Sequence, residues 1–310
     1  MAEKRSYEVI IIGGGPAGLS AGLYSARARH DTLLLERDVV GGQIINVEKI
    51  ENYPGFPEGI DGFELSQLMQ TQAEKYGLVF VTAEATGLEI DGNGRKVVRT
   101  TDGDYEADAV IFAGAAKRIK MGVPGEEEFN GRGVSVCATC DAPLFAEQPV
   151  AVTGGGNSAL TEALHLAKFA SRVSVIHRRD QLRAGPILQE RAFAEPKIEF
   201  LWDTTVDSVE GDVFVEKLNL NNVKTGEKTV LPVAGIFVSI GFQPDTAYLN
   251  NVVPLDNSGH IVTNTEMETE VPGVFAAGDI RSKLTRQVIT AAGDGATAAV
   301  SAGRYITEKH

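Results

Sequence analysis

A glycine-rich segment that occurs twice constrains the fold of this chain more than any other feature of its sequence. The strand-like residues 8–12 lead into Gly-Gly-Gly-Pro-Ala-Gly at residues 13–18, and an alanine-rich stretch follows to about Ala28. A second strand-like run at residues 32–35 ends at Glu36. A strand, a glycine turn, a helix and a second strand that ends in an acid make up the βαβ unit that binds dinucleotides. The pattern therefore predicts such a unit near the N-terminus.

Each glycine has a separate task in a unit of this kind. Gly13 allows the tight turn, Gly15 lets the pyrophosphate approach the backbone, and Gly18 lets the helix pack against the strand. The N–H groups at the helix N-terminus would bind the phosphates, and Glu36 would accept hydrogen bonds from ribose hydroxyls. Glycines alone are also compatible with a turn that binds no ligand. The complete set of strands, helix and acid favours a nucleotide site.

The same pattern recurs in the middle of the chain. Residues 150–153 are strand-like, residues 154–159 read Gly-Gly-Gly-Asn-Ser-Ala, and a helical stretch reaches about Phe169. Residues 173–176 form the next strand-like run. The sequence therefore predicts a second dinucleotide-binding unit.

The two units differ where their second strands end. At the position equivalent to Glu36 the second unit has His177, and Arg178, Arg179 and Arg183 follow. An acid repels the 2′-phosphate of NADPH, whereas guanidinium groups bind it with paired N–H donors. The second unit is therefore predicted to prefer NADPH over NADH. A solvated basic surface is the alternative for the arginines, and His177 would either line the adenosine pocket or cap the strand end.

Composition and charge exclude several classes of protein. Hydrophobic residues make up 43% and charged residues 23% of the chain, as in ordinary globular proteins. The net charge of -13 disfavours contact with nucleic-acid phosphates. No apolar run approaches the roughly 18 residues of a membrane span, and the N-terminus lacks the pattern of a secretory signal. We predict a cytoplasmic protein with no nucleic-acid or membrane partner.

The cysteine pair is the main chemical feature of the sequence. The chain has two cysteines, Cys137 and Cys140, in the segment Cys-Ala-Thr-Cys-Asp. At this spacing they can close a small redox-active disulfide ring. Structural zinc would need four ligands, and no second cysteine pair or nearby histidine pair is present. A buried, inert pair remains as the other alternative.

Asp141 follows the second cysteine directly. In a pocket beside a flavin, desolvation would raise the pKa of its carboxyl, which could then hold a proton near neutral pH and protonate a thiolate. The alternative is an acid at a helix start that accepts hydrogen bonds from backbone N–H groups.

These motifs, taken in their order along the chain, resemble those of low-molecular-weight thioredoxin reductases of bacteria and archaea. The resemblance extends over essentially the whole length. It rests on residues 13–18, 41–43, 51–55, 137–141, 154–159, 177–179, 273–279, 286–287 and 291–295.

The resemblance implies an α/β fold with two Rossmann-like dinucleotide-binding domains. The NADPH domain, residues 118–245, would carry the redox pair and be inserted into a discontinuous FAD domain made of residues 1–117 and 246–310. It also implies a homodimer, a rotation of the two domains during turnover, and FAD and NADPH as cofactors. The activity would be the NADPH-dependent reduction of thioredoxin or a thioredoxin-like protein.

The family's site residues can be assigned to matching positions. Cys140 would face the flavin, and Cys137 would attack the disulfide of the partner. Asp279 would bind the sugar-phosphate part of FAD, although a turn aspartate is the alternative. Arg286 and Gln287 would approach the flavin ring. The predicted FAD residues are Gly13, Gly15, Pro16, Ala17, Gly18, Glu36, Arg37, Gly42, Gln43, Asn52, Gly278, Asp279, Arg286, Gln287 and Val288. The predicted NADPH residues are Gly154, Gly156, Asn157, Ser158, Ala159, His177, Arg178, Arg179, Arg183 and Gly241.

The sequence departs from the family pattern at three places. Ala113 stands where threonine is frequent, Ala142-Pro143 where glycine is common, and Thr161 where an acid is frequent. The first would remove a hydroxyl near the flavin, and the second affects the helix start after the cysteines.

Two other functions remain open from the sequence. One is a flavin-dependent reductase of another small disulfide carrier, either glutaredoxin-like or linked to a peroxidase. The other is a redox sensor that holds FAD without turnover. The arginines of the second unit count against a sensor, since it has little need of an NADPH site.

Overall fold

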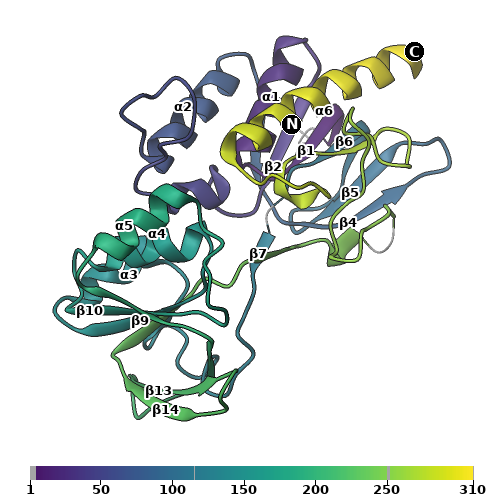
Figure 1. Cartoon of the computed structure of the whole chain (residues 1–310). Helices are drawn as coiled ribbons and strands as arrows, with labels where there is room; N and C mark the ends of the chain where they lie inside the picture. Colours follow the sequence, from purple (N-terminus) through teal and green to yellow (C-terminus); the bar gives the residue numbers. More distant parts are fainter. Residues whose placement is uncertain (1–4, 115, 250–251, 310) are drawn as a thin grey trace. The chain divides into compact units, whose positions relative to one another are not determined.

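The computed structural model describes residues 5–114, 116–249 and 252–309. The chain divides into two compact units (Figure 1). The first contains the residues up to Lys117 and those from Gln243 onward, and the second is Arg118–Phe242. The chain passes between them along β7 (Ala116–Arg118) and β16 (Phe242–Pro244), which pair with each other. The second unit is thus an insertion in the first.

A mixed sheet forms the centre of the first unit, in the order β3-β2-β1-β6-β5-β4. Its parallel part follows the predicted βαβ pattern, because β1 pairs in parallel with both β2 and β6, and β17 continues beside β6. Strand β5 pairs antiparallel with β6, and β4 pairs antiparallel with β5, so β4 forms the edge of the sheet opposite β3. The strands are β1 (Ser6–Ile12), β2 (Thr32–Glu36), β3 (Val79–Thr82), β4 (Ala85–Ile90), β5 (Lys96–Thr100), β6 (Tyr105–Phe112) and β17 (Val274–Ala276).

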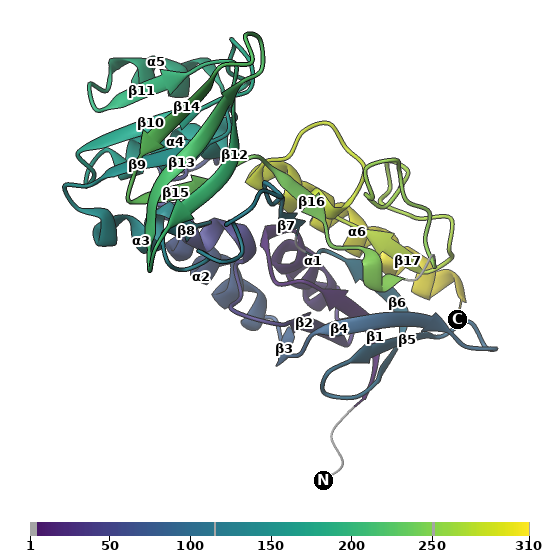
Figure 2. The same cartoon turned by 90° about the horizontal axis from the view of Figure 1, so that it is seen from below.

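Strand β1 is buried on both faces, and helices cover one of them. In Figure 2, α1 and α6 lie on one side of β1, β2 and β6, and their apolar residues form one core cluster with Val9 and Ile11. Ile10 and Ile12 face a second cluster on the opposite side. The helical segments are α1 (Pro16–Arg27), η1 (Gly42–Asn46), α2 (Gly62–Glu74), η3 (Ala247–Leu249), η4 (Gly278–Ile280) and α6 (Val288–Lys309).

The second unit is built around a parallel sheet in the order β11-β10-β9-β15-β8. Residues along β9 alternate between the two faces, as the two-residue period of a strand requires: Val150 and Val152 pack against helices, and Ala151 packs against the antiparallel sheet β12-β13-β14. Its strands are β8 (Val134–Ser135), β9 (Pro149–Thr153), β10 (Arg172–Ile176), β11 (Ile198–Leu201), β12 (Thr204–Gly211), β13 (Val215–Asn222), β14 (Lys228–Pro232) and β15 (Gly235–Val238). Its helical segments are α3 (Ala138–Asp141), η2 (Ala142–Phe145), α4 (Asn157–Leu166) and α5 (Pro186–Ala194).

Each unit therefore contains the strand, glycine turn, helix and strand that the sequence predicts. The α/β fold class with two Rossmann-like units is confirmed, and the second unit lies within the first. Helix α4 ends at Leu166, slightly before the predicted end near Phe169. Within residues 5–114, 116–249 and 252–309, no helix is long and apolar enough to cross a membrane.

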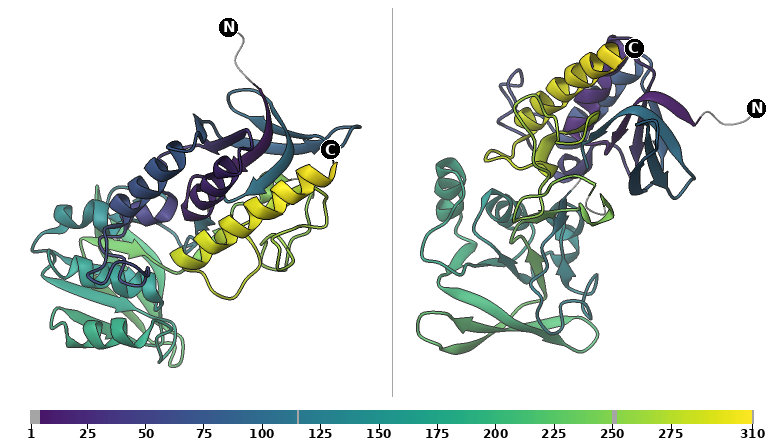
Figure 3. Two further views of the ribbon diagram at one scale, coloured as in Figure 1. Left: turned by 90° about the horizontal axis from the view of Figure 1, so that it is seen from above. Right: turned by 90° about the vertical axis from the view of Figure 1, so that its right-hand side faces the viewer.

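Helices α1 and α6 lie side by side (Figure 3) and approach each other closely at one glycine. A Cβ at Gly295 would lie 2.0 Å from the backbone oxygen of Ala17. Any larger residue at this position must therefore separate the helix that follows the first glycine turn from the C-terminal helix.

We expect Gly295→Ala to lower the free energy of unfolding by about 1–3 kcal/mol, since it overpacks the contact between α1 and α6. Gly293→Ala is the matched control, because this glycine is on the same helix but a Cβ there would meet no atom within 4 Å. The control should stabilise the protein by about 0.5–1 kcal/mol through helix propensity. Urea unfolding of both variants at equal FAD content measures the difference, and equal effects would contradict the close approach.

Candidate functional site

The first glycine turn is fixed by backbone contacts at the carboxyl end of β1. Gly13 has a φ of +109°, and a Cβ there would lie 2.5 Å from the Ala113 oxygen, so only glycine fits. The N–H of Gly14 donates to Oε2 of Glu36 at 2.6 Å. The Gly14 oxygen accepts from the N–H of Gly41 at 2.8 Å. The turn is thus held between the end of β2 and the segment that begins η1.

The N-terminus of α1 is open to a ligand. Gly15 is the N-cap, no side chain caps the helix, and Pro16 occupies its first position. Gly42 faces Gly15 closely, since a Cβ on Gly42 would lie 3.1 Å from the Gly15 Cα. The uncapped backbone N–H groups of Ala17 and Gly18 suit an anion such as a pyrophosphate.

Asp279 offers a buried hydrogen-bond acceptor in the first unit. The Oδ1 atom of Asp279 is buried and has no hydrogen-bond partner among the described residues. Burial raises the pKa of this carboxyl, although Lys283 and Arg286 act in the opposite direction. A buried polar atom without a partner is costly, so a hydroxyl of a bound sugar would satisfy it. The residues of this unit therefore fit FAD.

A neighbouring carboxylate fixes the backbone beside Asp279. Asp294 on α6 accepts from the N–H of Gly278 at 3.1 Å, from Nε of Arg281 at 2.9 Å and from Nζ of Lys283 at 2.8 Å. The segment 278–283 is thereby tied to the helix that packs on α1.

The remaining predicted FAD residues also lie in the first unit. Asn52 donates from Nδ2 to Oε1 of Gln287 at 2.8 Å, and Val288 begins α6. Arg286 contacts His260 Nε2 at 2.9 Å.

Two predicted FAD residues contact other parts of the first unit. The Arg37 guanidinium forms ion pairs with Asp38 at 2.9 Å and with Asp245 at 3.7 Å. Gln43 reaches the Ala116 oxygen at 3.5 Å.

The second glycine turn repeats this geometry in the second unit. Gly154 has a φ of +137°, and a Cβ there would lie 2.2 Å from the Ser239 oxygen. Gly156 is the N-cap of α4 without a side-chain cap, and a Cβ on it would meet nothing within 4 Å.

The other predicted NADPH residues near this turn lie on α4 and after β15. The first residue of α4, Asn157, accepts through Oδ1 from the N–H of Gly185 at 2.8 Å. Ser158 and Ala159 follow in the first turn of the helix, and Gly241, with a φ of +124°, lies beyond β15.

An arginine-lined pocket lies beyond β10. Arg178, Arg179 and Arg183 line a cavity of about 370 Å³. Among the described residues, their guanidinium groups have no hydrogen-bond or ion-pair partner in the protein. Arg99, by contrast, is paired with the carboxylates of Glu89 and Asp104. Unpaired guanidinium groups around one cavity fit the 2′-phosphate of NADPH.

His177 lies beneath the glycine turn and does not line this pocket. It is 4% exposed, and its Nε2 contacts the Gln181 oxygen at 3.0 Å. A Cβ on Gly155 would lie 2.4 Å from the ring. Burial and the nearby arginines lower the pKa of His177, which favours the neutral ring. The structure thus places this residue as a support for the turn.

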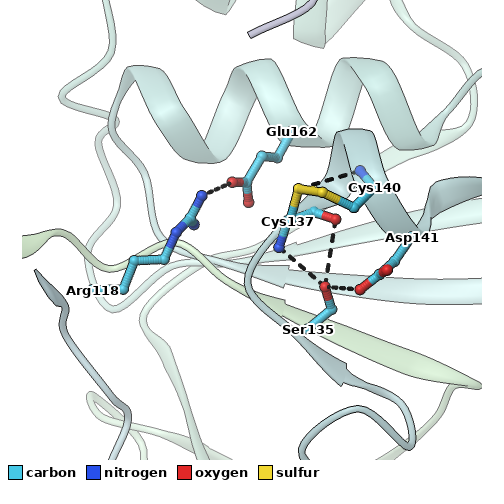
Figure 4. Close-up of a disulfide and its surroundings, with 6 residues drawn as sticks. All are labelled: Arg118, Ser135, Cys137, Cys140, Asp141 and Glu162. Carbon is cyan, nitrogen blue, oxygen red and sulfur yellow. Dashed lines mark hydrogen bonds and ion pairs between the residues drawn. A yellow bond between two sulfur atoms is a disulfide. The ribbon is translucent and has the colours of Figure 1, made fainter. Parts of the chain in front are cut away.

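The cysteines form a disulfide at the start of α3 (Figure 4). Cys137 is the N-cap residue, and its Sγ accepts from the N–H of Cys140 at 3.2 Å. The two Cα atoms are 5.4 Å apart. Cys137 is half-buried, while Cys140 is exposed within this unit.

Ser135 connects Asp141 to the cysteine turn. Its hydroxyl donates to Oδ2 of Asp141 at 2.7 Å and accepts from the N–H of Cys137 at 3.1 Å (Figure 4). Sequence reasoning did not identify Ser135, because its contact with Asp141 depends on how β8 meets α3. Ala142, one of the departures from the family pattern, is buried against α4.

A partly buried ion pair was also missed. Arg118 donates to Oε1 of Glu162 at 2.9 Å and to the Val238 oxygen at 3.2 Å, and Ser239 donates to the other Glu162 oxygen. Figure 4 shows the pair of Arg118 and Glu162 beside α4. Burial raises the pKa of Glu162, opposed by Arg118 and Ser239. The only signal in the sequence is its excess of acidic residues, and composition does not identify which residues form a pair.

Comparison with known proteins agrees with this architecture. The model of the family described as pyridine nucleotide-disulphide oxidoreductase matches residues 7–295. A thioredoxin reductase from Bacillus subtilis is 46% identical over 309 residues, which cover 99% of this chain and 97% of the relative. One from Streptomyces coelicolor is 45% identical over 300 residues, covering 96% and 93%.

Solved structures give the same result. The thioredoxin reductase of Lactococcus lactis superposes with a TM-score of 0.95 at 44% identity, covering 97% of this chain and 99% of that one. That of T. acidophilum gives a TM-score of 0.93 at 32% identity, with 99% and 100% covered. The chain therefore belongs to the pyridine nucleotide-disulphide oxidoreductase family, among the low-molecular-weight thioredoxin reductases.

Proposed function

We propose that this chain is an NADPH-dependent thioredoxin reductase that uses FAD and the Cys137–Cys140 disulfide. The observation that carries the proposal is the disulfide at the start of α3, within a nucleotide-binding unit inserted in another. Relatives that are 44–46% identical over 99% of this chain bear the name thioredoxin reductase.

The first unit would be the FAD domain. The open N-terminus of α1 would hold the pyrophosphate, Glu36 and Asp279 would bind sugar hydroxyls, and Arg286 with Gln287 would approach the flavin ring. When bound, FAD would accept a hydride from NADPH and pass an electron pair to the disulfide. The further residues proposed here are Gly13, Gly15, Pro16, Ala17, Gly18, Arg37, Gly42, Gln43, Asn52, Gly278 and Val288.

The second unit would be the NADPH domain. The N-terminus of α4 would hold the pyrophosphate, and Arg178, Arg179 and Arg183 would bind the 2′-phosphate. His177 would support the turn from below. The further residues proposed here are Gly154, Gly156, Asn157, Ser158, Ala159 and Gly241.

The cysteines would carry out thiol–disulfide exchange. After two electrons and two protons have converted the disulfide to a dithiol, the Cys137 thiolate attacks one sulfur of the thioredoxin disulfide, and the other sulfur leaves. Cys140 then attacks Cys137, which releases reduced thioredoxin and restores the disulfide. Asp141 would hold and transfer the proton that the leaving thiolate needs, oriented by the Ser135 hydroxyl.

We further propose that the protein is a cytoplasmic homodimer. The homodimer rests on the family resemblance, and the cytoplasmic location on a sequence in which no apolar run approaches the length of a membrane span. The net charge of -13 disfavours nucleic-acid partners.

Cys137→Ser and Cys140→Ser should each abolish thioredoxin reduction and leave FAD bound. A serine at position 137 can still cap α3, so the loss would be chemical and not structural. Flavin reduction by NADPH, followed by absorbance under anaerobic conditions, should survive in both variants. Thioredoxin turnover near the wild-type rate in either would remove the disulfide from the electron path.

Asp141→Asn should slow thioredoxin turnover by about 10²-fold, because an amide cannot transfer the proton. The amide oxygen can still accept from Ser135, so the local geometry is retained. Ser135→Ala is the comparison: it removes this hydrogen bond and keeps the carboxyl, and we expect a loss of less than about tenfold. Rates measured across pH test both, and an unchanged rate and pH profile in Asp141→Asn would return Asp141 to a role at the helix start.

Replacing Arg178 and Arg179 by alanine should raise the KM for NADPH by about 10²-fold. Two charge-assisted contacts would be lost, and exposure to solvent and salt limits their contribution. The KM for NADH and the FAD content should remain unchanged, because NADH has no 2′-phosphate and Glu36 belongs to the other unit. Equal weakening of both nucleotides in steady-state kinetics would show that these arginines do not recognise the phosphate.

A further inference from the structure

The arginine-lined pocket contains a lysine from a distant part of the chain. Lys224 lies on the turn between β13 and β14 and lines the same cavity as Arg178, Arg179 and Arg183. The turn reaches the pocket because β12 and β13 pack beneath the parallel sheet. Three segments, the loop after β10, the turn before β12 and this hairpin, therefore meet around the cavity.

Backbone hydrogen bonds fix the hairpin turn at the pocket. Asn222 accepts through Oδ1 from the N–H groups of Lys224 and Thr225, each at 3.0 Å. The N–H of Val223 donates to the backbone carbonyl oxygen of Asp203 at 2.6 Å. Gly226, with a φ of +73°, completes the turn. A lysine on such an ordered turn loses less conformational entropy when it binds an anion than one on a mobile loop.

Two carboxylates hold the Lys224 ammonium group at the cavity. Nζ lies 2.9 Å from Oδ2 of Asp180 and 3.0 Å from Oδ2 of Asp203. Both acids line the same pocket, and the Asp203 side chain is 16% exposed. The pair with Asp180, followed by that with Asp203, raises the pKa of Lys224. Without the lysine, both acids would face a bound phosphate and repel it.

Another lysine of the same hairpin shows what an ordinary surface ion pair looks like here. Lys228 pairs with Asp207, and neither residue lines the cavity. Lys224 differs because it shares its cavity with unpaired arginines, and this difference provides a matched control.

We propose that Lys224 is a specificity-determining residue for the 2′-phosphate of NADPH, positioned by Asp180 and Asp203. It adds a cation to the phosphate pocket from a separate segment and neutralises the acids at its wall. This inference rests on the proposed NADPH site. It extends that site beyond the arginines that follow β10.

The test compares Lys224→Met with Lys228→Met in the FAD-loaded enzyme. Calorimetry with adenosine 2′,5′-bisphosphate should give a 5- to 10-fold lower affinity for Lys224→Met and no change for Lys228→Met, since an exposed charge-assisted contact contributes modestly. Binding of adenosine 5′-monophosphate, which lacks the 2′-phosphate, should be unchanged in both. Added salt should weaken bisphosphate binding less in Lys224→Met than in the wild type.

The pair Arg178→Ala/Arg179→Ala separates this inference from the proposed function. Lower affinity in the arginine variant with wild-type affinity in Lys224→Met would overturn the role of Lys224 alone. Wild-type affinity in both would overturn the phosphate site and the inference with it. An equal loss in Lys228→Met, or an equal loss for both nucleotides in Lys224→Met, would also overturn it, because the effect would then be one of general charge or structure.

Discussion

Both nucleotide-binding units depend on the contact of a glycine turn with the end of a neighbouring parallel strand. In the first unit Gly13 lies against the Ala113 oxygen just beyond β6, and in the second Gly154 lies against the Ser239 oxygen just beyond β15. These contacts leave no room for a Cβ. They hold the helix that follows with its N-terminus at the carboxyl edge of the sheet, where dinucleotides bind in open α/β folds. The position of each helix relative to the end of its sheet therefore depends on one steric condition.

The two units use the residue after the second strand in different ways. In the first, the Glu36 carboxylate accepts a hydrogen bond from the N–H of Gly14, so an acid stands beside the turn. In the second, the buried ring of His177 occupies the equivalent place and packs against Gly155. A neutral ring at this position replaces the acid that stands beside the turn in the first unit. The arginines that follow line the pocket, and their guanidinium groups have no carboxylate partner in the described part of the chain. A single scaffold thus yields one site suited to ribose hydroxyls and another suited to a phosphate.

The local patterns could be predicted from the sequence, whereas contacts between distant segments could not. The glycine turns, their helices and the cysteine turn depend on neighbours within a few residues, and the structure has them where the sequence indicates. His177 left two alternatives, because its place beneath the turn depends on how β10 pairs with β9. Lys224 reaches the arginine pocket only through the packing of β13 beneath the parallel sheet, far along the chain from the arginines. Sequence spacing contains no information about such meetings.

The partly buried pair of Arg118 and Glu162 joins the segment where the chain enters the second unit to α4. Arg118 stands where the chain enters the unit, while Val238 and Ser239 stand where its last strand ends. Arg118 donates to the Val238 oxygen and to Glu162, and Ser239 donates to Glu162. Glu162 belongs to α4, the helix that follows the second glycine turn. For an ion pair that is shielded in part from water, the cost of desolvation offsets much of the attraction. The contribution of the pair lies in geometry, because these hydrogen bonds join Arg118, the end of β15 and α4 within the second unit.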